Sequence, residues 1–330
     1  MKDFARLATE SLGAWEGVCP KSLHFCISKD KSPLYALAWI NFGKSVITGA
    51  ESGEIAQWNG TVFTLERNFV AHNTSIISLV LSKNESIVVT GDDSGQIRIW
   101  NKDLQAKGEL GVHTESVRSV SFAPESNKVL TCSDDKTAKV TDIETGKIDT
   151  TFNKHGAEVK SCDWHPSKGL VMTGGKDNFG KLWDPRTTEE LCTLYAHNQH
   201  ISKIKWHANG NWVATGSKDS SVRVHDIRTM KTFRNFQQHK KEVSALSWHP
   251  TIEELLVSGS LDNSMVYWNV REESMIKEIL QAHDKEITGI EWHPLGHMIA
   301  TSSLDNTTKF WGRAKCGDES KLLYNVVKPL

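Results

Sequence analysis

The sequence predicts an all-β fold, a seven-bladed β-propeller closed by an N-terminal strand, because three ladders of residues recur with one period. Histidines recur at intervals of 41, 42, 42, 42 and 44 residues, at His72, His113, His155, His197, His239 and His283. A tryptophan ladder with two interruptions keeps step with them, at Trp58, Trp100, Thr141, Trp183, His225, Trp268 and Trp311. Ten residues before each of its members stands a hydroxyl, at Thr48, Thr90, Thr131, Thr173, Thr215, Ser258 and Thr301. A repeat near 42 residues is typical of one four-stranded blade, so seven members predict seven blades.

The composition is that of an ordinary globular protein whose net charge attracts no particular partner. The chain has 330 residues, 38% of them hydrophobic and 24% charged, and a formal net charge of −1. Because the net charge is close to zero, the protein as a whole does not attract nucleic acid electrostatically. Any contact with nucleic acid has to come from a local patch of charge. No run approaches the roughly 18 apolar residues of a membrane span, and residues 1–20 lack the pattern of a secretory signal. We therefore expect no membrane contact and no export.

The cysteines indicate neither disulfides nor a metal site. The six show no paired spacing, at Cys19, Cys26, Cys132, Cys162, Cys192 and Cys316. A metal site uses close pairs, and a chain of this size needs no disulfides. We expect free thiols in a reducing compartment, no bound metal or cofactor, and no small-molecule substrate.

The two ends of the chain are predicted to complete the ring. We expect residues 1–22 to form a segment docked on the ring, residues 23–314 to form the propeller and residues 315–330 to form a C-terminal tail. The seventh blade lacks an outer strand, because the residues after Trp311 have the composition of a loop. The segment Leu23–Ser28 offers the missing strand. Pairing it with the last blade covers two otherwise open sheet edges.

Strands inside a blade are predicted from alternating apolar residues between turns rich in Gly, Asn, Asp and Ser. In the fifth blade this rule predicts strands at residues 201–206, 212–215, 221–224 and 230–236. The last of these is polar, as expected for a strand at the edge of a sheet.

Each complete repeat also contains the residue types of a hydrolase triad, followed by a Trp. The full sets are His155, Thr173, Asp177 and Trp183; His239, Ser258, Asp262 and Trp268; and His283, Thr301, Asp305 and Trp311. Repetition argues against catalysis, since one active site needs one set. A buried hydrogen-bond chain from Asp through His and the hydroxyl to the indole explains the pattern. We expect no catalytic residue, and weaker chains where Ser52 and Ser94 occupy the Asp position or where Thr141 and His225 replace Trp.

Four further histidines follow a Trp at the same point of successive blades: His165, His207, His249 and His293. A ring of histidines suggests a metal site. However, neighbouring blades hold them too far apart for a coordination shell of about 2 Å. We interpret them as turn residues at the end of a strand.

The repeat resembles the WD-repeat family, with the dipeptide intact at Trp183-Asp184. A closer resemblance rests on an ordered set of segments: HGAEVK at 155–160, DWHP at 163–166, NGNW at 209–212, HKKE at 239–242, WHPLGH at 292–297 and TKFW at 308–311. Together these are similar to the WD-repeat subunit of the eukaryotic pre-mRNA cleavage and polyadenylation specificity factor. The resemblance covers nearly all of residues 23–318 and is strongest over residues 155–312.

That resemblance implies a nuclear, non-enzymatic scaffold. Its implied partners are a large triple-propeller subunit and a zinc-finger subunit, with pre-mRNA bound through the complex at an AAUAAA-type signal. This chain departs from the family in its short N-terminal arm and in Leu65, which stands where relatives have an aromatic residue. Leu can cover a base but has no π face for stacking. The RNA-binding candidates are Lys29, Lys31, Leu65 and Arg67.

For the cations on the rim of the ring two interpretations stay open, and for the function of the protein one rival stays open. Cations on the loops at the narrow end of the ring form either a solvated rim or an interaction face: Arg118, Lys160, Lys176, Lys218, Lys240 and Lys241. A rival function is substrate receptor of a cullin-type ubiquitin ligase. Its support is a W-D-x-R motif at residues 183–186 and a near match at residues 225–228.

Overall fold

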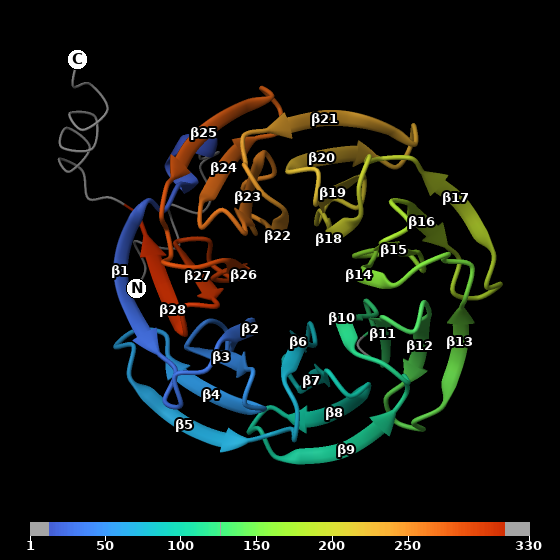
Figure 1. Cartoon of the computed structure of the whole chain (residues 1–330), viewed down its shortest axis with the longest axis horizontal. Helices are drawn as coiled ribbons and strands as arrows, with labels where there is room; N and C mark the ends of the chain where they lie inside the picture. Colours follow the sequence, from blue (N-terminus) through green and yellow to red (C-terminus); the bar gives the residue numbers. More distant parts are fainter. Residues whose placement is uncertain (1–12, 126, 314–330) are drawn as a thin grey trace.

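The computed structural model describes residues 13–125 and 127–313, and over these residues it confirms the seven-bladed β-propeller. Seven four-stranded sheets stand around a central channel (Figure 1). In six of them consecutive strands pair in chain order, so each blade is an antiparallel meander running outward from the channel. Short turns suffice for such connections, which explains the regular repeat length.

The strands occupy four concentric positions (Figure 1). The innermost strands, which line the channel, are β2 (Leu34–Ile40), β6 (Ile76–Leu81), β10 (Val117–Phe122), β14 (Val159–Trp164), β18 (Ile201–Trp206), β22 (Val243–Trp248) and β26 (Ile287–Trp292). The second strands are β3 (Ser45–Ala50), β7 (Ile87–Asp92), β11 (Lys128–Ser133), β15 (Val171–Gly175), β19 (Trp212–Ser217), β23 (Leu255–Ser260) and β27 (Met298–Ser303).

The third strands are β4 (Glu54–Asn59), β8 (Gln96–Asn101), β12 (Ala138–Asp142), β16 (Gly180–Trp183), β20 (Ser221–Asp226), β24 (Met265–Asn269) and β28 (Thr307–Gly312). The outermost strands are β5 (Leu65–Val70), β9 (Ala106–Gly111), β13 (Ile148–Phe152), β17 (Glu190–Leu194), β21 (Lys231–Gln237), β25 (Ser274–Ile279) and β1 (Lys21–Ile27). The fifth-blade strands predicted from sequence are all present, with ends that differ by at most two residues.

The N-terminal strand closes the ring, as predicted. Strand β1 pairs antiparallel with β28, from Lys21 opposite Gly312 to Ile27 opposite Thr307. It begins two residues earlier than the alternation predicts. Beyond it, the Ser28 amide donates to the Asn306 carbonyl at 2.9 Å. The seventh blade is therefore built from both ends of the propeller and holds the ring shut.

The residues before β1 pack against the sixth and seventh blades. A short 3₁₀ helix, η1 (Ala14–Gly17), is followed by Cys19, which is fully buried beside blade residues including Ile299. The Tyr267 hydroxyl donates to the Cys19 carbonyl at 2.8 Å. Residues 1–12 of the expected docked segment, and the expected tail at 315–330, lie outside the described residues.

The hydrophobic core lies between the blades. Every residue of β23 is buried, whereas β9 is almost entirely exposed or half-buried. A glycine in several second strands allows the next blade to approach. At Gly216, for example, a Cβ would lie 2.7 Å from Val243 of the following inner strand. Each blade therefore buries its faces only against its neighbours, as expected for this architecture.

Candidate functional site

The triad-like residues form closed hydrogen-bond chains inside the blades. In the fourth blade His155 Nδ1 lies 2.8 Å from Asp177, and His155 Nε2 lies 2.6 Å from the Thr173 hydroxyl. The Trp183 indole N–H donates to the same hydroxyl at 2.7 Å. Since a carboxylate only accepts, Nδ1 donates to it, and Nε2 accepts from the hydroxyl. Burial would raise the pKa of Asp177, but the hydrogen bond from His155 holds it below the usual range.

The sixth and seventh blades contain the same chain with one variation. His283 contacts Asp305 at 2.8 Å and Thr301 at 2.7 Å, and the Trp311 indole donates to Thr301 at 2.9 Å. In the sixth blade His239 and Trp268 each lie 2.7 Å from the Ser258 hydroxyl. There, Ser264 lies 3.0 Å from His239 Nδ1, while Asp262 lies 3.4 Å away. A serine thus intervenes between carboxylate and imidazole.

The weakened chain expected in the second blade is not what the structure contains. His72 Nδ1 bonds Asp92 at 3.0 Å, and Ser94 donates to that carboxylate instead of replacing it. Asp92 follows the ladder hydroxyl Thr90 by two residues rather than four, so a search at fixed spacing misses it. The first blade keeps only the bond from Trp58 to Thr48, at 3.2 Å.

The two interruptions of the tryptophan ladder have different consequences. In the third blade the Thr141 hydroxyl is buried and has no hydrogen-bond partner. In the fifth blade His225 takes the indole's place, with Nε2 3.0 Å from Thr215 and Nδ1 3.3 Å from Thr232. Burial lowers the pKa of His225 to about 3, so it is neutral at physiological pH. A neutral imidazole therefore completes the chain where threonine does not.

These chains cannot reach a substrate. The ladder hydroxyls in all seven blades are at most 1% exposed. Each is enclosed by its own histidine or tryptophan, so none of these seven hydroxyls faces a cleft. Fully satisfied buried networks fix local geometry, which is the role that this arrangement can fill.

Three of the four histidines that follow a tryptophan link neighbouring blades through hydrogen bonds, whereas His207 accepts a hydrogen bond from the turn that follows it. His165 Nε2 donates to the Gly210 carbonyl at 2.9 Å, and His249 Nε2 donates to the Gly296 carbonyl at 3.0 Å. His293 packs in the same way on Gly43 of the first blade. Nδ1 accepts backbone amides of the following turn, as Lys168 shows for His165 at 2.8 Å. Sequence placed these residues at turns but did not reveal the bonds between blades.

Half of the predicted interaction-face cations are engaged in ion pairs. We call the face that carries the loops from each outermost strand to the next innermost strand the upper face. On it, Arg118 Nε donates to Asp134 at 2.6 Å and Lys160 bonds the same carboxylate at 2.7 Å. Lys176 pairs with Glu158. Lys218, Lys240 and Lys241 are exposed, and no ion pair to them is found within the described residues.

The structure does not bring the four RNA-binding candidates together. Lys29 and Lys31 are exposed in the loop from β1 to β2, on the upper face. Leu65 lies at the other end of the hairpin of β4 and β5, opposite Trp58 and five residues from Val70. At about 3.3 Å per residue the separation along the strand is about 17 Å. Arg67 is exposed, but its guanidinium donates to the Asp103 carbonyl at 2.7 Å.

An apolar surface on the opposite, lower face escaped the sequence analysis. Phe42 is 76% exposed, and Leu295 in the corresponding turn of the seventh blade is 73% exposed. Val62, on the next lower-face turn of the first blade, is 64% exposed. Phe42 has a positive φ of 55°, and its amide is held by Glu85 of the second blade at 2.7 Å. A strand-end turn carries no periodic signal that distinguishes an exposed Phe from a buried one.

Other chemistries find little support in the described part of the chain. No group of three His, Cys, Asp or Glu side chains there could hold a metal ion. Five cysteines are free thiols, four of them buried. Residues 13–125 and 127–313 include no helix long and apolar enough to span a membrane.

Comparison with known families agrees with this architecture. A family model described as "Nucleolar protein 10-like, N-terminal domain" matches residues 112–312, more than half of the chain. The chain belongs to this family. A second model, "WD domain, G-beta repeat", matches residues 63–101, so the protein is a WD-repeat propeller. Propellers of the WD-repeat class are usually non-catalytic scaffolds.

Curated relatives match shorter parts of this propeller. It is 31% identical over 131 residues to Polyadenylation factor subunit 2 of Candida albicans, which is 40% of this chain and 24% of that protein. The identity is 35% over 141 residues to the protein of the same name in Neurospora crassa, 43% of this chain and 21% of the relative. Protein ROOT INITIATION DEFECTIVE 3 of Arabidopsis thaliana is 28% identical over 130 residues, 35% of this chain and 30% of its own. This propeller thus spans less than a third of each.

Proposed function

We propose that this propeller is a non-enzymatic scaffold subunit of the mRNA 3′-end cleavage and polyadenylation machinery, where it organises the module that recognises the AAUAAA-type signal. The observation that carries the proposal is the similarity of 31–35% to Polyadenylation factor subunit 2 proteins. The buried ladder hydroxyls support a scaffold function. They are not accessible to a substrate, so the surfaces of the ring are the candidate binding sites. The proposal places the protein in the nucleus, with a triple-propeller subunit and a zinc-finger subunit as partners.

Two surfaces are proposed to contact those partners. On the upper face, Lys218, Lys240 and Lys241 are the free cations, whereas Arg118 and Lys160 are already held by Asp134. Because the described part of the protein holds no ion pair to these three lysines, no such contact is lost when they bind a carboxylate or phosphate of a partner. On the lower face, Phe42 and Leu295 supply exposed apolar area of the kind found at interface centres. Lys29 and Lys31 are proposed to touch RNA phosphates, and the separated Leu65 is not part of that contact.

Affinity purification of the tagged full chain from nuclear extract tests the proposal. We expect the two polyadenylation subunits to co-purify, and Lys240→Glu with Lys241→Glu to reduce their recovery. A matched pair, Lys107→Glu and Lys277→Glu on the outer strands β9 and β25, should leave recovery unchanged. Recovery of nucleolar proteins in place of these subunits would overturn the assignment.

The alternative is a substrate receptor of a cullin-type ubiquitin ligase. The observation that favours it is the exposed Arg186 of the W-D-x-R motif, which follows the buried Trp183. Arg186→Ala should abolish capture of a ligase adaptor and a cullin if this alternative holds. Arg228→Ala at the near match is the control, because that guanidinium is held by Asp226 at 2.7 Å. Under the proposed function neither substitution changes the recovered proteins.

A further inference from the structure

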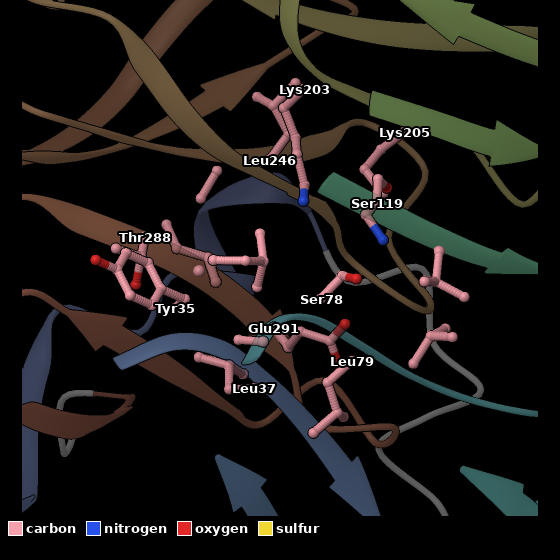
Figure 2. Close-up of a pocket in the computed structure, with 17 residues that line it drawn as sticks. Tyr35, Leu37, Ser78, Leu79, Ser119, Lys203, Lys205, Leu246, Thr288 and Glu291 are labelled. Atoms are coloured by element: carbon pink, nitrogen blue, oxygen red, sulfur yellow. The ribbon is translucent and has the colours of Figure 1, made fainter. Parts of the chain in front are cut away.

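The central channel contains a partly open cavity lined by charged side chains, two of them lysines with no ion pair within the described residues. The cavity measures about 70 Å³ and is bounded by six of the seven innermost strands, namely β2, β6, β10, β18, β22 and β26. Lys203 and Lys205 enter it from β18, and Glu291 enters it from β26 across the ring. Figure 2 shows these three side chains directed into the space between the strands.

The two ammonium groups lack the partners that normally accompany enclosed cations. In the described part of the chain no hydrogen bond or ion pair joins Lys203 or Lys205 to another side chain. Glu291 attracts both electrostatically, which leaves the cavity with an excess of one positive charge. Burial and the neighbouring Lys205 lower the pKa of Lys203. One carboxylate does not balance two ammonium groups in a half-buried site, so the arrangement favours an added anion.

Further donors around the cavity suit an anion with several oxygens. The hydroxyls of Ser78 and Ser119 also line the space, and each makes only a long bond of 3.3 Å to a carbonyl. At roughly 10–15 Å³ for each water, the cavity holds about five to seven water molecules. That space suits a small tetrahedral oxyanion.

We propose that the channel of this propeller is a binding site for a free tetrahedral oxyanion, phosphate or sulfate, held between Lys203 and Lys205. The anion balances the excess charge and bridges strands from opposite sides of the ring. Glu291 opposes the anion and keeps the affinity moderate. The site is separate from the partner surfaces on the upper and lower faces.

Calorimetric titration of the full chain with inorganic phosphate in low-chloride buffer tests the site. We expect Lys203→Met and Lys205→Met each to weaken binding at least about tenfold, because a charge-assisted hydrogen bond contributes about that factor or more. Glu291→Gln should strengthen binding several-fold, a gain that misfolding cannot imitate. Lys107→Met on β9 removes an exposed lysine and should leave the affinity unchanged.

Sulfate and O-phosphoserine distinguish the possible sources of the anion. Sulfate should compete with phosphate, whereas O-phosphoserine should not, because its seryl group exceeds the space. The proposal is overturned if wild-type protein binds no phosphate at millimolar concentration, or if the affinity is the same in the Lys203, Lys205 and Glu291 variants. Equal binding of O-phosphoserine would likewise overturn a site for the free anion.

Discussion

Replacing Thr173 by Val should reveal what one complete hydrogen-bond chain contributes to the stability of the ring. The side chain is fully buried, and Val matches its shape without the hydroxyl. The substitution removes the bond to His155 at 2.6 Å and the bond from Trp183 at 2.7 Å. It therefore leaves an imidazole nitrogen and an indole N–H buried without partners. Each such orphaned group costs about 1–3 kcal/mol, so the free energy of unfolding should fall by about 4 kcal/mol.

The third blade provides a matched control, because its ladder position holds Thr141 instead of Trp. The hydroxyl of Thr131 is equally buried and bonds His113 at 2.8 Å, but no indole donates to it. Thr131→Val orphans one group rather than two, so we expect a loss of about 2 kcal/mol. Urea unfolding followed by tryptophan fluorescence measures both losses. Equal losses in the two variants, or a loss below about 0.5 kcal/mol for Thr173→Val, would refute the reasoning.

Three further predictions concern closure, acid stability and RNA contact. Deleting residues 1–28 should collapse the thermal stability, because β1 is the outer strand of the seventh blade; an unchanged melting temperature would refute closure. Between pH 6.5 and pH 4 the free energy of unfolding should fall as the pH falls, by up to about 1.4 kcal/mol per pH unit for each of two buried rings. Burial lowers the pKa of His249 and His293 to about 4, whereas the unfolded rings titrate near 6.5. A flat unfolding free energy across that range would contradict this. Changing Lys29 and Lys31 to Glu should weaken RNA cross-linking of the assembled module, and undiminished cross-linking would exclude the site.

The acid sensitivity has a specific structural cause. In the folded protein His249 Nδ1 accepts the Ile252 amide at 2.9 Å while Nε2 donates to the next blade at 3.0 Å. A protonated ring cannot accept, so protonation breaks the turn that holds the link between blades. The unfolded chain takes up the proton near pH 6.5, and the difference in proton binding drives unfolding as the pH falls.

The sequence by itself determined the features that repeat within a blade. The 42-residue period, the alternation in strands such as β18 and the spacing from His155 to Trp183 are local, so they are visible along the chain. The sequence also showed that the seventh blade lacks an outer strand and that a strand near residue 23 can replace it. This pairing was predictable because unpaired sheet edges at the two ends of the array are unfavourable. Asp92 was missed because the carboxylate can occupy a second position in the turn and still reach the imidazole.

Only the tertiary structure decided which residues of different blades meet. The Gly210 carbonyl lies 45 residues from His165, yet it is that ring's acceptor because the blades stand side by side. Lys205 and Glu291 share the channel because the ring closes on itself. Lys31 and Leu65 lie apart because the two ends of a strand are on opposite faces of the ring. Periodicity specifies a blade, but the curvature that sets contacts across the ring arises from packing between all seven.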